Sequence, residues 1–406
     1  MDNLSHSIVG LAIGELLERT LAPEPDAARQ ALRRRLLLFT GWAGSNLPDL
    51  DLVLIPLLPA PLGYLMHHRG HTHTLLYALP QALALLAAIW LLWPKARTLL
   101  RQSRPARRAI VAAAGLGLLL HLAMDYLNVY GVHLLYPFDT RWQYGDLVFI
   151  VEPAFWVIFG TPLAAMVGSR WARIGLFGLL AAIPALATLA GFLPWGSLAG
   201  LALLALLLLG LQHRAGGRVA LAAAFVAAMA AVALQGVAAR SARATVMAQL
   251  AAKGGTARVL DVALSAYPAN PVCWNVATVE SDEGAGTYRV RRGVVSVAPW
   301  LTLAADCPAR LRGAALLSAT PKLGWLWEQR ASLAALRRMQ GADCHFDAWM
   351  RFARVPWVDA AAATDARYGA PGELNFSTMR LARMAGKPCP AYVPTWGRPR
   401  EDLLRP

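Results

Sequence analysis

The sequence is poor in charged residues, and cysteine is missing from its first 272 positions. Charged residues make up 16% of the 406 residues and hydrophobic residues 57%, whereas soluble domains carry about 25% charged residues. This balance excludes an ordinary soluble protein and indicates a membrane protein. The cysteines come late and contain no CxxC pair, at Cys273, Cys307, Cys344 and Cys389. Their even number and wide spacing favour one or two disulfides in an oxidising compartment over four buried free thiols.

The start of the chain lacks the basic region of a cleavable signal peptide. Asp2 is the first charged residue, and the polar pair Ser5-His6 interrupts the first apolar run, so we expect no cleaved leader here. The net charge is +15, but much of it lies in short loops beside apolar runs, where membrane topology explains it. We therefore predict no nucleic-acid partner.

Apolar runs long enough to cross a bilayer are confined to the first 240 residues. They lie at 4–21, 36–58, 74–94, 109–127, 147–167, 174–193, 196–212 and 218–239. The first two are weak, because charged residues or Pro48 interrupt them, so we expect about six to eight transmembrane helices. The predicted fold is a polytopic α-helical membrane domain, residues 1–240, which carries a metal site.

From residue 241 onward the chain has ordinary polarity, which predicts a separate extramembrane domain, residues 241–406. Segments rich in Val, Thr and Tyr predict strands at 257–264, 272–280 and 287–298, and two further segments read as helices at 331–340 and 345–354. We expect this domain to have an α+β fold.

The distribution of Lys and Arg predicts the orientation of the spans. The loop 95–108 holds six basic residues and no acidic one, which is typical of a cytoplasmic loop. With eight spans, the other basic clusters fall on the same side, at 29–35, 170–173 and 213–218. Both termini and the C-terminal domain then face the periplasm of a bacterial inner membrane. In this topology every candidate site residue gathers at the outer face.

The segment 67–73 is the strongest candidate for a binding site. It places four histidines and Arg69 within seven residues directly before an apolar run. Such groups are costly at a membrane boundary unless they bind something. We take His68 and His73 as preferred metal ligands, with His71 and His67 next, and Arg69 as a fixed cation for an anionic oxygen. A histidine cluster that only reaches toward the membrane interface is the alternative.

Carboxylates beside other apolar runs complete a ligand set. Asp49 and Asp51 follow Pro48, which stops the preceding helix, and two close carboxylates repel each other unless a cation neutralises them. A solvated turn is the alternative there. His121 and Asp125 are four apart in a helical run, so they share one helix face. Their alternative is a structural His–Asp hydrogen bond. Histidine nitrogens with carboxylate oxygens are typical of hydrolytic metal centres.

These motifs, taken in order, resemble a known family. The elements are His6, Leu47-Pro48-Asp49-Leu50-Asp51, the segment 68–73, His121 with Asp125, and Tyr136-Pro137-Phe138. They are similar to the motifs of the bacterial membrane-bound metal-dependent hydrolases, the YdjM/YbcI-like family, over about residues 1–155. The chain departs from the pattern at Thr74, where Ser is frequent, and at Glu152, where we expect Asp. The resemblance supports metal chemistry better than any one substrate.

We therefore expect a membrane-bound, metal-dependent hydrolase with one or two divalent ions, zinc first and manganese or iron next. The expected ligands are Asp49, Asp51, His68, His73, His121 and Asp125, with His6, His71 and Glu152 in reserve. We assign catalytic roles to Arg69 and Glu152. The site position favours membrane lipids, a phospholipid or another lipid-linked ester, as substrate, and the sequence does not identify protein partners. The rival interpretations are a metal-ion or small-solute transporter and a structural anchor for the C-terminal domain.

Overall fold

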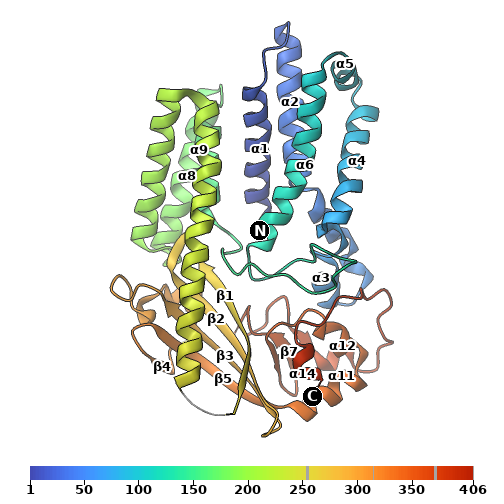
Figure 1. The fold of residues 1–406 in the computed structure, drawn as a ribbon, viewed down its shortest axis with the longest axis vertical. Coiled ribbons are helices and arrows are strands. Elements are labelled where there is room, and N and C mark those ends of the chain that lie inside the picture. Colours follow the sequence, from blue (N-terminus) through green and yellow to red (C-terminus); the bar gives the residue numbers. More distant parts are fainter. Residues whose placement is uncertain (253–255, 314, 370–372, 406) are drawn as a thin grey trace. The chain divides into compact units, whose positions relative to one another are not determined.

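The computed structural model of the protein describes residues 1–252, 256–313, 315–369 and 373–405 (Figure 1). The chain forms two compact units. The first, which we call the helical unit, comprises Met1–Leu50, Thr72–Asn128 and Phe149–Leu234. The second, the sheet unit, comprises Asp51–His71, Val129–Val148 and Gln235–Pro406. Two segments from the N-terminal half therefore belong to the same unit as the C-terminal domain.

The helical unit is built from α-helices of different length and polarity. They are α1 (Asn3–Thr20), α2 (Ala27–Gly44), α4 (Leu75–Leu92), α5 (Pro94–Gln102), α6 (Arg104–Tyr126), α7 (Pro153–Ala165), α8 (Arg170–Leu189) and the first part of α9 (Trp195–Ala252). Short polar side chains begin most of them, because each accepts a hydrogen bond from an unpaired backbone N–H of the first turn. These caps are Asp2, Asp26, Thr74, Ser103 and Ser169.

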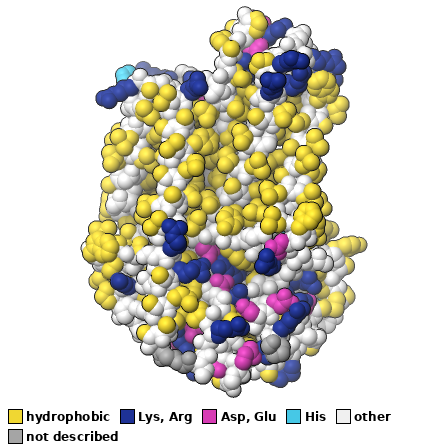
Figure 2. Space-filling model, in the orientation of Figure 1, with side chains coloured by type: hydrophobic (Ala, Val, Ile, Leu, Met, Phe, Trp, Pro, Cys, Tyr) yellow, Lys and Arg dark blue, Asp and Glu magenta, His cyan; other side chains and the backbone are white. Residues whose placement is uncertain are grey.

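Among the described residues, four helices are long and apolar enough to cross a membrane: α4, α6, α8 and α9. Gly216, whose φ is 82°, divides α9 into two helical parts, which correspond to the expected runs 196–212 and 218–239. The expected total of six to eight spans is not confirmed. Figure 2 shows hydrophobic side chains over the helices, with Lys and Arg gathered at the end that carries α5.

Two of the expected spans have a different form in the structure. The run 36–58 is not one helix, because α2 ends at Gly44 and a 3-10 helix, η1 (Leu47–Leu57), follows. Pro48 explains this break, since it cannot donate within a continuing helix. The run 147–167 yields only the 13 residues of α7, because Pro153 starts that helix. Apolar length alone therefore overstated both segments.

Glycines allow α1, α2 and α6 to pack closely together near His121. A Cβ atom on Gly10 would collide with the carbonyl oxygen of Gly41 on α2. A Cβ atom on Gly117 would lie 3.0 Å from the Gly41 carbonyl oxygen and 3.0 Å from the Ser45 nitrogen. A side chain at position 117 would therefore require the backbones of α2 and α6 to move apart by a few tenths of an ångström.

The sheet unit contains two antiparallel sheets among its described residues. The larger has the order β1-β2-β3-β5-β4 and the smaller the order β6-β7-β8. The larger comprises β1 (Arg258–Tyr267), β2 (Asn270–Asp282), β3 (Thr287–Ser296), β4 (Ser318–Ala319) and β5 (Leu323–Ser332), and the smaller β6 (Pro356–Val358), β7 (Ala362–Asp365) and β8 (Met379–Arg380). The expectation of strands in the C-terminal part is confirmed.

Short helices and two disulfides complete this unit. The helices are α3 (Leu62–His67), η2 (His71–His73, which continues into the helical unit), η3 (Ala304–Asp306), α10 (Ala309–Arg312), α11 (Leu333–Ala342), α12 (Cys344–Met350), α13 (Leu381–Met384) and α14 (Glu401–Leu404). The disulfides join Cys273 to Cys307 and Cys344 to Cys389. All four cysteines are therefore paired, and the prediction of one or two disulfides is confirmed with two.

Candidate metal centre

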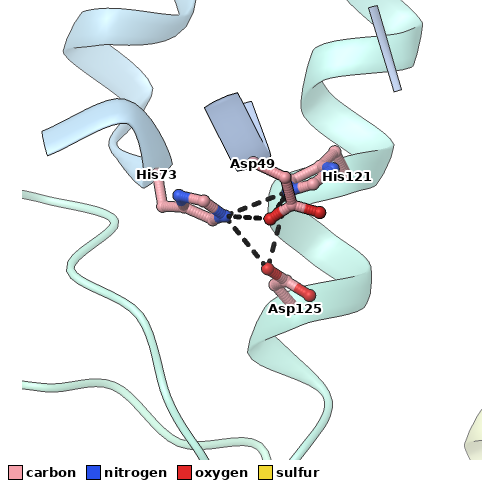
Figure 3. A group of neighbouring side chains, drawn as sticks. All are labelled: Asp49, His73, His121 and Asp125. Atoms are coloured by element: carbon pink, nitrogen blue, oxygen red, sulfur yellow. Dashed lines mark hydrogen bonds and ion pairs between the residues drawn. The ribbon is translucent and has the colours of Figure 1, made fainter. Parts of the chain in front are cut away.

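Four buried side chains of the helical unit converge on one point (Figure 3): Asp49, His73, His121 and Asp125. His73 Nε2 lies 3.4 Å from Asp49 Oδ1 and 3.1 Å from Asp125 Oδ2. His121 Nε2 lies 3.7 Å from Asp49 Oδ1 and 3.5 Å from Asp125 Oδ2. The two Nε2 atoms are 3.0 Å apart. One ligand atom from each residue lies within 4.8 Å of all the others.

The members of this group, the four-residue cluster, come from three elements of the helical unit. Asp49 lies in the first turn of η1, directly after the helix-stopping Pro48. His73 ends η2, just before Thr74 caps α4. His121 and Asp125 are one helical turn apart on α6, so both project from the same face. The helix break at Pro48 is what allows Asp49 to face α6.

A backbone carbonyl fixes the orientation of His121. Its Nδ1 lies 2.7 Å from the carbonyl oxygen of Ser45. A carbonyl oxygen only accepts, so we assign the proton of His121 to Nδ1, which leaves the Nε2 lone pair facing the cluster. Metal-binding histidines are held in this manner by a hydrogen bond at the other ring nitrogen. His73 has a comparable neighbour, since its Nδ1 lies 3.0 Å from Thr72 Oγ1.

His6 lies beside the cluster and supports two of its members. Its Nε2 is 3.2 Å from Asp125 Oδ1, and its ring stacks on His121 with centroids 3.9 Å apart. The Met1 amine also contacts Asp125 Oδ1. The two oxygens of Asp125 are thus used differently. Oδ1 faces His6 and Met1, whereas Oδ2 faces the imidazoles of His73 and His121.

The donor geometry suits a small divalent cation. Zinc bonds to N and O ligands of about 2.0–2.1 Å place tetrahedral ligand atoms about 3.3 Å apart. The five measured separations within the cluster span 3.0 to 3.7 Å. Two buried carboxylates close together also favour a cation between them, because burial and mutual repulsion both oppose their ionisation. His/Asp donor sets accept Zn²⁺, Mn²⁺ or Fe²⁺.

Three other expected site residues, Asp51, His68 and Arg69, belong to the sheet unit. Asp51 Oδ1 lies 3.1 Å from His68 Nδ1, and Asp51 Oδ2 accepts a hydrogen bond from the Arg69 backbone N–H at 2.8 Å. The Arg69 guanidinium lies over the Tyr130 ring, 4.8 Å from its centroid, and only 1% of the residue is exposed. This places a fixed positive charge in a buried, aromatic setting.

Two further expected site residues, His71 and Glu152, make other contacts. The ring of His71 packs against Trp396 and Tyr136, with centroid distances of 4.8 and 5.2 Å. Glu152 caps α7, since its Oε1 accepts from the Ala154 N–H at 3.1 Å. Proline is favoured at the first position of a helix, and Pro153 takes that position in α7 directly after Glu152. Neither residue belongs to the four-residue cluster.

Sequence patterns missed two contributors to these sites. The Ser45 carbonyl is a backbone group, so the residue type at this position does not predict its contact with His121. Trp396 lies close to the C-terminal end of the sequence, yet its Nε1 donates to the Met66 carbonyl at 2.9 Å. Its ring also stacks on His133, with centroids 4.0 Å apart. The contact joins positions 330 residues apart, which no local pattern predicts.

Comparison with known proteins places the chain in a family. The family model described as YdjM inner membrane protein matches residues 1–241, more than half of the chain and all of the four-residue cluster. The uncharacterized protein YfhP of Bacillus subtilis (strain 168) is 29% identical over 168 residues, which is 41% of this chain and 45% of that protein. The match thus spans less than half of that relative's length. No solved structure matches the chain. On the family match, the protein belongs to the YdjM family of inner membrane proteins.

Proposed function

We propose that the protein is an integral membrane, metal-dependent hydrolase that acts on a phospholipid or another lipid-linked ester at the outer face of the inner membrane. The observation that carries the proposal is the convergence of Asp49, His73, His121 and Asp125 within 4.8 Å. Buried His and Asp donors at bonding distance from one centre form the ligand set of hydrolytic metal sites.

The four cluster residues would hold one divalent ion, with zinc as the first choice. When bound, such an ion lowers the pKa of a coordinated water to about 7 and stabilises negative charge on the group that is attacked. The chain's own part is orientation: Ser45 holds His121, and His6 holds Asp125. Asp51 and His68 of the sheet unit are two further donors for a second ion.

We assign Arg69 the binding of an anionic substrate oxygen. Its guanidinium carries a permanent charge and is almost fully buried over Tyr130. Its backbone N–H donates to Asp51 Oδ2. Arg69 lies four residues before His73, and this bond fixes the backbone there. A phosphate or carboxylate suits such a group better than a neutral ester does.

Membrane location supports a lipid-linked substrate. The chain belongs to an inner membrane family, and His121 and Asp125 lie on α6, one of the membrane-length helices. An enzyme for soluble substrates has little need of catalytic groups on such a helix. A metal-ion or small-solute transporter is the second candidate, because buried Asp and His on a membrane helix also mark ion pathways.

The first test is the metal content of the protein purified in mild detergent, by elemental analysis per chain. The wild type is compared with Asp125→Ala and with Asp306→Ala, an exposed aspartate of the sheet unit. We expect at least one equivalent of a transition metal in the wild type and Asp306→Ala, and its loss in Asp125→Ala. Folded wild-type protein that holds no metal even after reloading would remove the proposal.

The second test separates hydrolysis from transport. The metal-loaded protein is offered phospholipids and other lipid-linked esters in detergent, and metal uptake is measured in proteoliposomes. Hydrolysis that is lost in the double variant His73→Ala, Asp125→Ala supports the hydrolase. Metal uptake without hydrolysis supports the transporter. A double variant with full hydrolytic activity would contradict the assignment of the cluster.

A further inference from the structure

We propose that residues 297–307 of the sheet unit form a membrane-contact loop, which inserts its apolar tip into the interfacial layer of the bilayer that the helices cross. The tip carries three large apolar side chains with high exposure. Exposed fractions are 79% for Trp300, 71% for Leu301 and 43% for Leu303. Large apolar side chains that are exposed together at neighbouring positions of a loop are typical of an interaction site.

Hydrogen bonds within the loop fix the conformation of its tip. The Leu301 and Thr302 N–H groups donate to the Ala298 carbonyl at 2.9 and 3.1 Å. Ser296 Oγ donates to the Thr302 carbonyl at 2.6 Å. The Ala304 N–H donates to the Pro321 carbonyl at 3.0 Å. These bonds leave Trp300 and Leu301 at the outside of a defined turn.

A disulfide and a buried cluster anchor the base of the loop. Cys307 is bonded to Cys273 at the start of β2. Cys307 and Ala304 are buried together with Tyr267 and Val294, at the ends of β1 and β3. The exposed apolar tip therefore stands on a rigid, buried base, and its exposure is a property of the fold.

Chain direction places this base near the point where α9 leaves its apolar stretch. That stretch ends before Arg240. Asp146 Oδ2 lies 3.4 Å from a guanidinium nitrogen of Arg243 and 3.4 Å from the Leu264 N–H, so β1 passes α9 at that level. Because β1 follows α9 and packs in the same buried cluster, it runs back along the helix (Figure 1). Its last residue, Tyr267, lies at the end nearer Arg240.

A second contact gives the distance along α9 between the base of this loop and Arg240. Gln249 Nε2 donates to Thr320 Oγ1 at 2.9 Å, nine residues beyond Arg240. At 1.5 Å rise per residue this is about 13 Å along the helix. The Ala304 N–H donates to the carbonyl of Pro321, the residue after Thr320, and Trp300 lies four residues before Ala304. The interfacial layer extends about 5–7 Å beyond the hydrocarbon core, so the tip needs to cover only about half of the distance to Arg240 to enter that layer.

The charges beside the tip fit an anionic bilayer surface. The segment 297–322 contains three basic residues, Arg310, Arg312 and Lys322, and one acidic residue, Asp306. Arg310 and Lys322 are exposed. Exposed Trp and Leu with flanking Lys and Arg are the features of segments that lie in the headgroup region. Anionic headgroups attract each such base. A bilayer of this charge is thus the occupant that the loop fits.

Site-directed spin labelling tests the proposal on the full-length protein. All four native cysteines are paired, so Leu301→Cys supplies a single reactive thiol for a nitroxide. The matched control is Ala285→Cys, exposed in the β2–β3 turn at the opposite end of the same sheet. Both proteins are reconstituted in nanodiscs of phosphatidylethanolamine with phosphatidylglycerol. Accessibility of the label to oxygen and to a water-soluble nickel chelate is then measured.

We expect the label at 301 to be several-fold more accessible to oxygen, and less to nickel, than the label at 285. Replacing phosphatidylglycerol by phosphatidylcholine should reduce this difference. Equal nickel accessibility at both positions would overturn the proposal. Shielding from both reagents, together with dipolar coupling between labels on two copies, would also overturn it, since a second copy would then cover the loop.

Discussion

The Nδ1 nitrogen of His121 lies 2.7 Å from the carbonyl oxygen of Ser45, and this contact links the helix packing to the candidate metal centre. Ser45 is the C-cap residue of α2, where the last carbonyls of a helix lack a partner within it. The imidazole supplies that partner and is oriented in return. The position of α2 against α6 therefore controls where His121 Nε2 points.

We predict that Gly117→Ala weakens metal binding about tenfold, in the range found when a supporting contact of a ligand is lost. The added Cβ would lie 3.0 Å from the Ser45 nitrogen, so α6 must shift and the Ser45–His121 bond lengthens. Gly115→Ala is the matched control, since no atom of a described residue lies within 4 Å of a Cβ there. Metal titration in detergent measures both. Equal affinities in the two variants would contradict the prediction.

A second prediction concerns His6, which contacts Asp125 and stacks on His121 without joining the four-residue cluster. We expect His6→Ala to keep a bound metal but to lower its affinity by about 10- to 100-fold, as for other outer partners of ligands. His213→Ala, an exposed histidine of the same unit, should bind as the wild type does. Complete loss of metal from His6→Ala, as in Asp125→Ala, would instead make His6 a ligand.

Trp396 provides a third prediction, because it ties the C-terminal part of the chain to the histidine-rich segment. Trp396 is 1% exposed, and its Nε1 donates to the carbonyl oxygen of Met66. Trp396→Phe should lower the free energy of unfolding by about 1–3 kcal/mol, since the buried carbonyl loses its donor. Trp396→Ala should lower it by about 3–5 kcal/mol. Denaturant unfolding in detergent measures this; Trp300→Phe, at an exposed position, should change little. A Trp396→Ala protein with an unchanged midpoint would refute the prediction.

Much of the site was predictable where the pattern is local. His121 and Asp125 share a face because helical geometry requires it at a spacing of four. How the expected ligands Asp49 and Asp51, and His68 and His73, are divided between the two units was not predictable. Each pair is separated by only a few residues, yet one member belongs to the helical unit and the other to the sheet unit. That partition depends on how the whole segment 46–73 folds, which residue spacing does not encode.

The fold shows the same division between local and distant information. Runs of Val, Thr and Tyr predicted strands close to those of β1, β2 and β3, and cysteine spacing predicted disulfides. Apolar length predicted α4, α6 and α8 well, but it failed at 36–58, where Pro48 ends the helical path. The inclusion of the segments 51–71 and 129–148 in the sheet unit depends on contacts such as Trp396 with Met66, far apart in sequence.

The last prediction concerns the pH dependence of stability, through the buried ion pairs of Arg354. Its guanidinium lies 2.8 Å from Asp146 and 2.7 Å from Asp261. Burial opposes ionisation of Asp261, but Arg354, Arg400 and Arg243 outweigh it and lower the pKa of that carboxyl. A lowered folded-state pKa stabilises the fold above the unfolded value of about 3.9, and this stability is lost as pH falls through the folded pKa.

Asp261→Asn should therefore lower the free energy of unfolding at pH 7 by about 2 kcal/mol, the range for a hydrogen bond to a charged group. It should also flatten the decline in stability on acidification below about pH 4. Denaturant midpoints measured from pH 7 down to the acid limit, for wild type, Asp261→Asn and the exposed-site control Asp306→Asn, give both quantities. If wild type and Asp261→Asn decline in parallel, the ionised Asp261 does not stabilise the fold, and the pairing with Arg354 contributes packing alone.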